Sequence, residues 1–103
     1  MQITSPTSEI NLYGQNNMNE REMKSILKEL EELLIKKNKT YGDNNIVKMG
    51  KLGVLTRIEE KIERIKHMIN NNVRDDESIE DSWQDIAGFG IIGLMLERNK
   101  WNK

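Results

Sequence analysis

The stretch from Asp76 to Leu96 is the feature that most limits what this chain can fold into. It opens with acidic residues, which favour a helix N-terminus, and it ends in the run Phe89–Leu96, where nearly every residue is apolar. At about 100° per residue, the side chains of this run cover the whole circumference of a helix, which predicts burial on every side, inside a bundle or between subunits. The same spacing predicts a core-facing stripe made of Ile79, Ser82, Trp83, Ile86, Phe89, Gly90 and Gly93.

Two earlier segments also carry apolar residues at helical spacing. The first predicted helix covers about residues 20–37 and begins after Asn19, whose position three residues before Glu22 is typical of a capping box. The second covers about residues 53–70 and ends at the asparagine run Asn70–Asn72. Turn-forming residues between 38 and 53 predict a loop or a broken helix at that place.

Together with a third helix over about residues 76–97, these segments predict an all-α protein, a small bundle of three main helices. The expected organisation is a polar N-terminal arm over residues 1–18, a single helical domain over 19–98 and a tail over 99–103. A chain of 103 residues has room for one core but little room to enclose a deep cleft. A homo-oligomer with a shared site, formed through Phe89–Leu96, is therefore expected.

Charge and composition narrow the functional classes. Sixteen basic and seventeen acidic residues give a formal net charge of −1, so no overall field attracts long nucleic acid or an anionic membrane. The lack of cysteine removes disulfides, thiolate nucleophiles and cysteine-ligated metals. No signal-peptide pattern follows Met1, and the longest apolar run falls far short of the about 20 residues that a membrane span needs. We expect a cytoplasmic protein.

Charged residues lie on one flank of each of the last two predicted helices. On the second helix, Arg57, Lys61 and Arg64 share one side, and on the third helix Asp81 and Asp85 share one side. A short connection favours antiparallel packing of these two helices. This arrangement predicts that Lys61 or Arg57 pairs with Asp85 and that Arg64 pairs with Asp81, as a structural charge network.

The same residues carry a resemblance to a known family. In order, the chain contains KNKTYGDNN, GVLTRIEEKIERIKHMI and DESIEDSWQDIAGFGIIGLML, which together span about residues 37–96. This pattern resembles the phage and bacterial nucleotide modification associated domain family. That family is in turn similar to the all-α, MazG-like nucleoside triphosphate pyrophosphohydrolases, which use Mg²⁺ and helix-borne carboxylates. If the chain is phage-encoded, the host cytoplasm is its expected location.

The resemblance implies a site for a nucleotide or a nucleotide-derived small molecule. Asp85, Asp81 and Glu60 would be both the catalytic carboxylates and the Mg²⁺ ligands, since Mg²⁺ takes oxygen ligands and keeps several waters. The remaining phosphates and the base would be held by side chains of the predicted loop and the second helix: Lys39, Arg57, Lys61 and Arg64 for the phosphates, and Tyr41 for stacking on the base.

Two departures from the pyrophosphohydrolase pattern matter. Ser82 stands where the pattern has a carboxylate three residues before Asp85, although Asp81 projects to the same helical face and can substitute. Glu60 points away from the apolar side of its own helix, so only an oligomer that covers the outer face would bring it to the site. These departures leave two alternatives open. One is a non-catalytic nucleotide binder, such as a phage-type sponge for a host defence signal, and the other is a helical assembly or adaptor protein.

Overall fold

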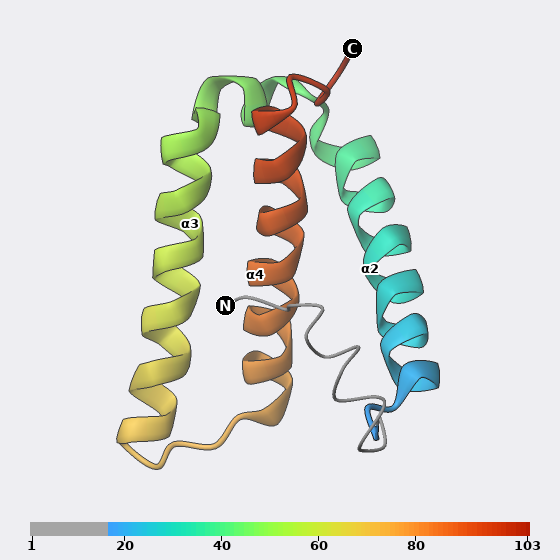
Figure 1. Cartoon of the computed structure of the whole chain (residues 1–103). Coiled ribbons are helices and arrows are strands. Elements are labelled where there is room, and N and C mark those ends of the chain that lie inside the picture. Colours follow the sequence, from blue (N-terminus) through green and yellow to red (C-terminus); the bar gives the residue numbers. More distant parts are fainter. Residues whose placement is uncertain (1–16) are drawn as a thin grey trace, which may run out of the picture.

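The computed structural model describes residues 17–103, so the predicted arm over residues 1–18 lies almost wholly outside the described residues. The described part consists of three α-helices: α2 (Glu20–Tyr41), α3 (Asn44–Asn70) and α4 (Asp76–Glu97). They run in alternating directions, and α4 stands between α3 and α2 (Figure 1). The predicted all-α bundle is confirmed for this part of the chain. Within it, no helix is long and apolar enough to cross a membrane.

The helix starts follow local signals that the sequence contains. The Asn19 side chain accepts a hydrogen bond of 2.9 Å from the backbone N–H of Glu22, and the Asp75 side chain accepts one of 3.2 Å from the N–H of Ser78. Both bonds satisfy an N–H group that has no partner inside its own helix. At the other end of α3, the helix stops at Asn70, and Asn72 adopts a left-handed conformation with φ of 54°. Asparagine tolerates this conformation better than most residues.

The segment between the first two predicted helices is a broken helix, one of the two forms that the sequence predicted for residues 38–53. The helical part is longer than expected, because α2 continues to Tyr41 and α3 begins at Asn44. Gly42, with φ of 76°, makes the turn, and Gly50, with φ of 65°, introduces a kink inside α3. Burial explains the added helical turns, because Ile46 is only 6% exposed and packs in the main core cluster.

The core lies mainly between α3 and α4. Val54, Ile46 and Ile92 form its centre, and Val54 is only 1% exposed. Half-buried apolar side chains surround this centre: Leu34, Met49, Ile58, Phe89, Leu96 and Trp101. Trp101 attaches the tail to the helices, because its indole N–H donates a hydrogen bond of 3.2 Å to the carbonyl of Asp43.

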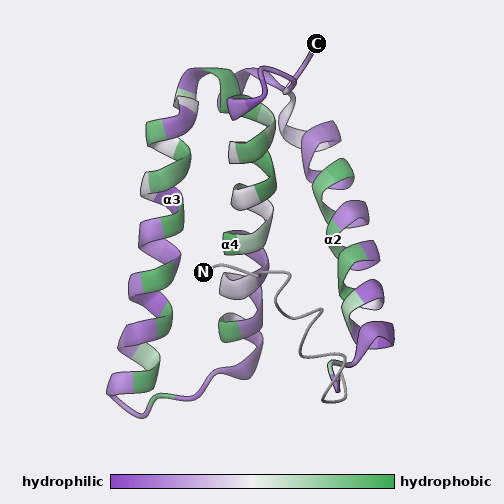
Figure 2. Ribbon diagram, in the orientation of Figure 1, coloured by the Kyte–Doolittle hydropathy of each residue, from purple (hydrophilic) through white to green (hydrophobic). Residues whose placement is uncertain are grey.

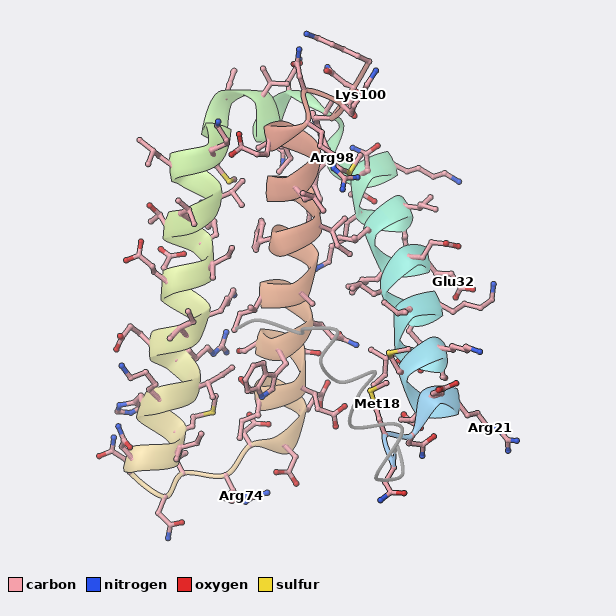
Figure 3. All side chains as sticks on the ribbon, viewed as in Figure 1. Met18, Arg21, Glu32, Arg74, Arg98 and Lys100 are labelled. Atoms are coloured by element: carbon pink, nitrogen blue, oxygen red, sulfur yellow. The ribbon has the colours of Figure 1, made fainter. Side chains whose placement is uncertain are left out.

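Helix α2 contacts the α3–α4 pair over a smaller area. Its hydrophobic residues lie on the side that faces α4 and its hydrophilic residues on the outer side (Figure 2), where Arg21 and Glu32 point away from α4 (Figure 3). The contact is close at Gly88, whose missing side chain leaves room for Leu34 and Leu30. Towards the N-terminus of α2 its apolar residues are less covered by α4, since Ile26 and Leu27 are about half exposed.

Several residues predicted to be in the core are exposed in the single chain. Trp83 is 59% exposed, and the run Phe89–Leu96 is not buried on every side, because Ile91 and Leu94 are exposed. The reason is geometric. Helix α4 has one neighbour on each of two sides, and the residues on its remaining side have no partner within the described chain.

A matched pair of glycine substitutions tests the contact between α2 and α4. We expect Gly90→Ala to stabilise the fold by about 0.5–1 kcal/mol, because alanine favours a helix and its Cβ meets nothing within 4 Å. Gly88→Ala is expected to gain less, because its Cβ would lie 3.1 Å from Leu34 Cδ2. Urea unfolding measures both changes, and equal gains would contradict close packing of α2 at Gly88.

Candidate functional site

The carboxylate of Asp85 lies between two lysines that come from different helices. Lys61 Nζ of α3 is 3.2 Å from Asp85 Oδ2, and Lys37 Nζ of α2 is 3.4 Å from Asp85 Oδ1. We call these three residues the Asp85 cluster. It joins all three described helices, and the predicted pairing of Lys61 with Asp85 is present. The side chains of Asp85 and Lys61 are 23% and 25% exposed, so this pair is partly shielded from water, whereas Lys37 is 47% exposed.

The positions of these residues in their helices explain why they meet. Lys61 lies close to the direction of Val54 on the helical wheel of α3, so it points towards α4 as the core residues do. Lys37 follows Leu30 by seven residues and lies on the side of α2 that faces α4. Each ammonium group sits at the water-facing edge of the packed surface, where the aliphatic stem can be covered while the charge stays hydrated.

A polar hollow lies about one helical turn before Asp85, towards the N-terminus of α4. It has a volume of about 240 Å³ and is lined by Arg64, Asp75, Glu77, Ser78 and Asp81. Arg64 and Asp81 therefore face the same hollow, as the wheel predicted, but they form no ion pair within 4.0 Å in the described chain. Arg64 follows Lys61 by three residues and Asp81 precedes Asp85 by four, so the hollow continues the charged side of the Asp85 cluster.

The three proposed metal ligands are not brought together within one chain. Glu60 is bound by its own neighbour on α3, Arg57, with Nη1 to Oε1 at 3.1 Å, and its side chain is 55% exposed. No group of three or more histidine, cysteine, aspartate or glutamate residues in the described part of the chain could hold a metal ion. Asp81 and Asp85 remain as two carboxylates on one side of α4. Glu60 does not join them.

The other predicted ligand-binding residues lie on solvent-facing positions. Lys39 is in the last turn of α2, and Tyr41, the last residue of that helix, is 68% exposed. Arg57 is half exposed and is occupied by Glu60. The structure therefore groups Lys61 with Asp85, and Arg64 with Asp81, but it shows no contact of Lys39, Tyr41 or Arg57 with either group.

Ser82 has a structural place that accounts for the departure from the carboxylate pattern. It is 1% exposed, and its hydroxyl donates a hydrogen bond of 2.9 Å to the carbonyl of Ser78 one turn earlier. A carboxylate at this position would be buried and would lose its hydration, which is costly unless the charge is paired. A small side chain whose hydroxyl bonds within its own helix fits this buried position.

Sequence reasoning did not identify Lys37 as a site residue. It stands at the C-terminal end of the α2 apolar stripe, seven residues after Leu30, where a solvated surface lysine would be out of phase. The position of Lys37 on the apolar side of its helix was the one hint in the sequence. Which residue of α4 it meets depends on how α2 packs against α4, and the sequence near Lys37 does not specify this packing.

The site can offer positive charge to an anion. An ammonium group has three N–H donors, so Lys37 and Lys61 can each contact Asp85 and still donate to phosphate oxygens. Arg64 adds a planar guanidinium that suits bidentate phosphate contacts.

Comparison with protein-family models, with curated proteins and with solved structures found no match for this chain.

Proposed function

We propose that this chain handles nucleotides and that it does so on the charged side of α3 and α4. The observation that carries the proposal is the placement of Lys37 and Lys61 on either side of Asp85, beside the hollow that Arg64 and Asp81 line. Among the described residues that line the hollow, Arg64 is the one cation beside Asp75, Glu77 and Asp81, whereas within the Asp85 cluster two ammonium groups exceed one carboxylate. A phosphate group is the part of a nucleotide that such an arrangement recognises.

The most concrete form of this function is Mg²⁺-dependent hydrolysis of a nucleoside triphosphate, as in the MazG-like enzymes that the sequence resembles. Two carboxylates are enough on the protein side, because Mg²⁺ commonly takes one or two carboxylates together with substrate phosphates and water. Asp81 and Asp85 would hold the ion, which neutralises phosphate charge and activates water. Lys37, Lys61 and Arg64 would hold the phosphates in place.

A release assay tests the hydrolase. We expect the wild-type chain with Mg²⁺ to release pyrophosphate or phosphate from at least one member of a nucleotide panel, and Asp85→Asn to lose that activity. Glu97→Gln is the matched control, since it makes the same chemical change on the same helix, at an exposed residue that pairs with Lys51. Turnover that survives in Asp85→Asn would contradict the assigned role of Asp85.

The non-catalytic binder is the second candidate, and a specific observation favours it. Both oxygens of Asp85 already face ammonium groups, at 3.4 Å and 3.2 Å, so the carboxylate can serve to position Lys37 and Lys61 for an anion. Tight binding of an intact nucleotide without Mg²⁺, with no turnover, would support this form over the hydrolase. Failure to bind any nucleotide, with or without Mg²⁺, would contradict both.

A further inference from the structure

Large apolar side chains are exposed on the side of α3 and α4 that is opposite to the Asp85 cluster. We call this set the outer apolar face; it consists of Leu55 (52% exposed), Ile62 (41%) and Ile69 (67%) on α3, and Trp83 (59%) and Leu94 (50%) on α4. Monomeric proteins rarely expose a continuous apolar patch of this kind. The nucleotide proposal makes no use of this face.

The helical wheels place these residues on one side. On α3, measured from the buried Val54, Ile62 lies about 80° to one side and Arg64 about 80° to the other. On α4, Trp83 lies about 160° from Asp85. Because α3 and α4 are antiparallel neighbours, the Ile62 side of α3 and the Trp83 side of α4 form one surface.

The spacing on α3 is that of a helix that packs against another helix. Leu55, Ile62 and Ile69 follow one another at intervals of seven residues, and the half-buried Ile58 and the buried Ile65 stand between them. This is the alternation of three and four residues found in packed helix pairs.

We propose that a second copy of this chain covers the outer apolar face, with α3 packed antiparallel against α3 of the partner across a twofold axis near Ile62. The sequence of α3 is self-complementary about this point. Antiparallel pairing centred at Ile62 sets Leu55 of one copy against Ile69 of the other. In this register Lys66 of one copy lies one residue from the position directly opposite Glu59 of the other, within reach of these long side chains, and a twofold axis makes each of these contacts twice.

Charge and size support the second copy as the occupant. Glu59 and Lys66 flank the apolar stripe on its solvent side, about 120–140° from Val54, where they would border the interface. The pair formed by α3 and α4 presents a face roughly 20 Å wide and 30 Å long. The area of this face is comparable with the surface that each partner buries in a stable interface, about 800 Å².

Mass in solution gives the first test. We expect the full chain at micromolar concentration to have twice its mass of 12.1 kDa by light scattering, and Ile62→Asp to be a folded monomer. Leu27→Asp is the control, because it puts the same charge at an apolar residue of similar exposure, 53%, that lies on α2 and outside this face. A monomeric wild-type chain would overturn the proposal. So would an Ile62→Asp chain that stays dimeric.

A charge exchange tests the orientation without altering the apolar residues. Glu59→Lys alone and Lys66→Glu alone each place like charges across the interface, and each is expected to weaken the dimer by about tenfold. An equimolar mixture of the two variants is expected to form the heterodimer in preference to either homodimer, because every pair is then opposite in charge. Random mixing would overturn the antiparallel arrangement.

A wild-type chain that becomes dimeric only when residues 1–16 are removed would identify that segment, and not a second copy, as the natural cover.

Because neither test uses a nucleotide, their outcome is separate from that of the nucleotide proposal.

Discussion

Replacing Val54 by Asp is expected to unfold the chain at room temperature. Val54 is 1% exposed, lies at the centre of the cluster with Ile46 and Ile92, and faces Gly93 of α4, where an added Cβ would lie 3.8 Å from Val54 Cγ1. A carboxylate there would have no paired charge, and burying such a group costs several kcal/mol. Small domains have only about 5–15 kcal/mol of stability in total. Far-ultraviolet circular dichroism, followed during heating, measures the loss.

Leu52→Asp is the matched control for this prediction. It makes a similar change two residues earlier on the same helix, but Leu52 is 80% exposed. We expect its free energy of unfolding to stay within about 0.5 kcal/mol of the wild-type value. Two equally unstable variants would mean that the core does not lie between α3 and α4 at Val54.

Replacing Lys61 by Glu is expected to abolish most nucleotide affinity, with a loss of about 100-fold. The change removes a cation that would contact phosphate, and charged hydrogen bonds of this kind contribute about 1.5–3 kcal/mol. It also places a second carboxylate beside Asp85, where Lys61 Nζ now lies 3.2 Å from Oδ2. Isothermal titration with a nucleotide that binds the wild-type chain measures the loss.

Lys48→Glu is the control, because it makes the same change in charge on α3 at an exposed lysine of the first turns. We expect this variant to keep the affinity of the wild-type chain. Equal losses in both variants would mean that nucleotides respond only to net charge. In that case the Asp85 cluster would have no special part in binding.

Features of the fold that depend on nearby residues were predictable from the sequence. Features that depend on packing against a distant part of the chain were not. Asn19 and Asp75 act on backbone groups within three residues, so their capping roles follow from the sequence nearby. The pairing of Lys61 with Asp85 was also predictable, since the wheel positions and a short connection determine it. By contrast, the extent of the helical turns around Ile46 depends on packing against Ile92 of α4, which is distant in sequence.

The same distinction applies to the candidate site and to the outer apolar face. Lys37 reaches Asp85 only because α2 approaches α4 at Gly88, and no local pattern specifies that approach. Trp83 was predicted to be buried because its helical spacing places it on the core-facing stripe of the third predicted helix. A helix that is apolar on several sides does not reveal which side faces its own chain and which faces a partner. Glu60 likewise lies on an outer side, bound to Arg57.

The most direct test of the proposed function is where a nucleotide contacts the chain. A chain of 12.1 kDa, or twice that mass as a dimer, suits two-dimensional amide NMR during titration with a nucleoside triphosphate, with and without Mg²⁺. The proposal predicts that the largest saturable shifts fall at Lys37, Lys61, Arg64, Asp81 and Asp85. No saturable shifts across a nucleotide panel, or shifts confined to Ile62 and Trp83 on the opposite side, would contradict it.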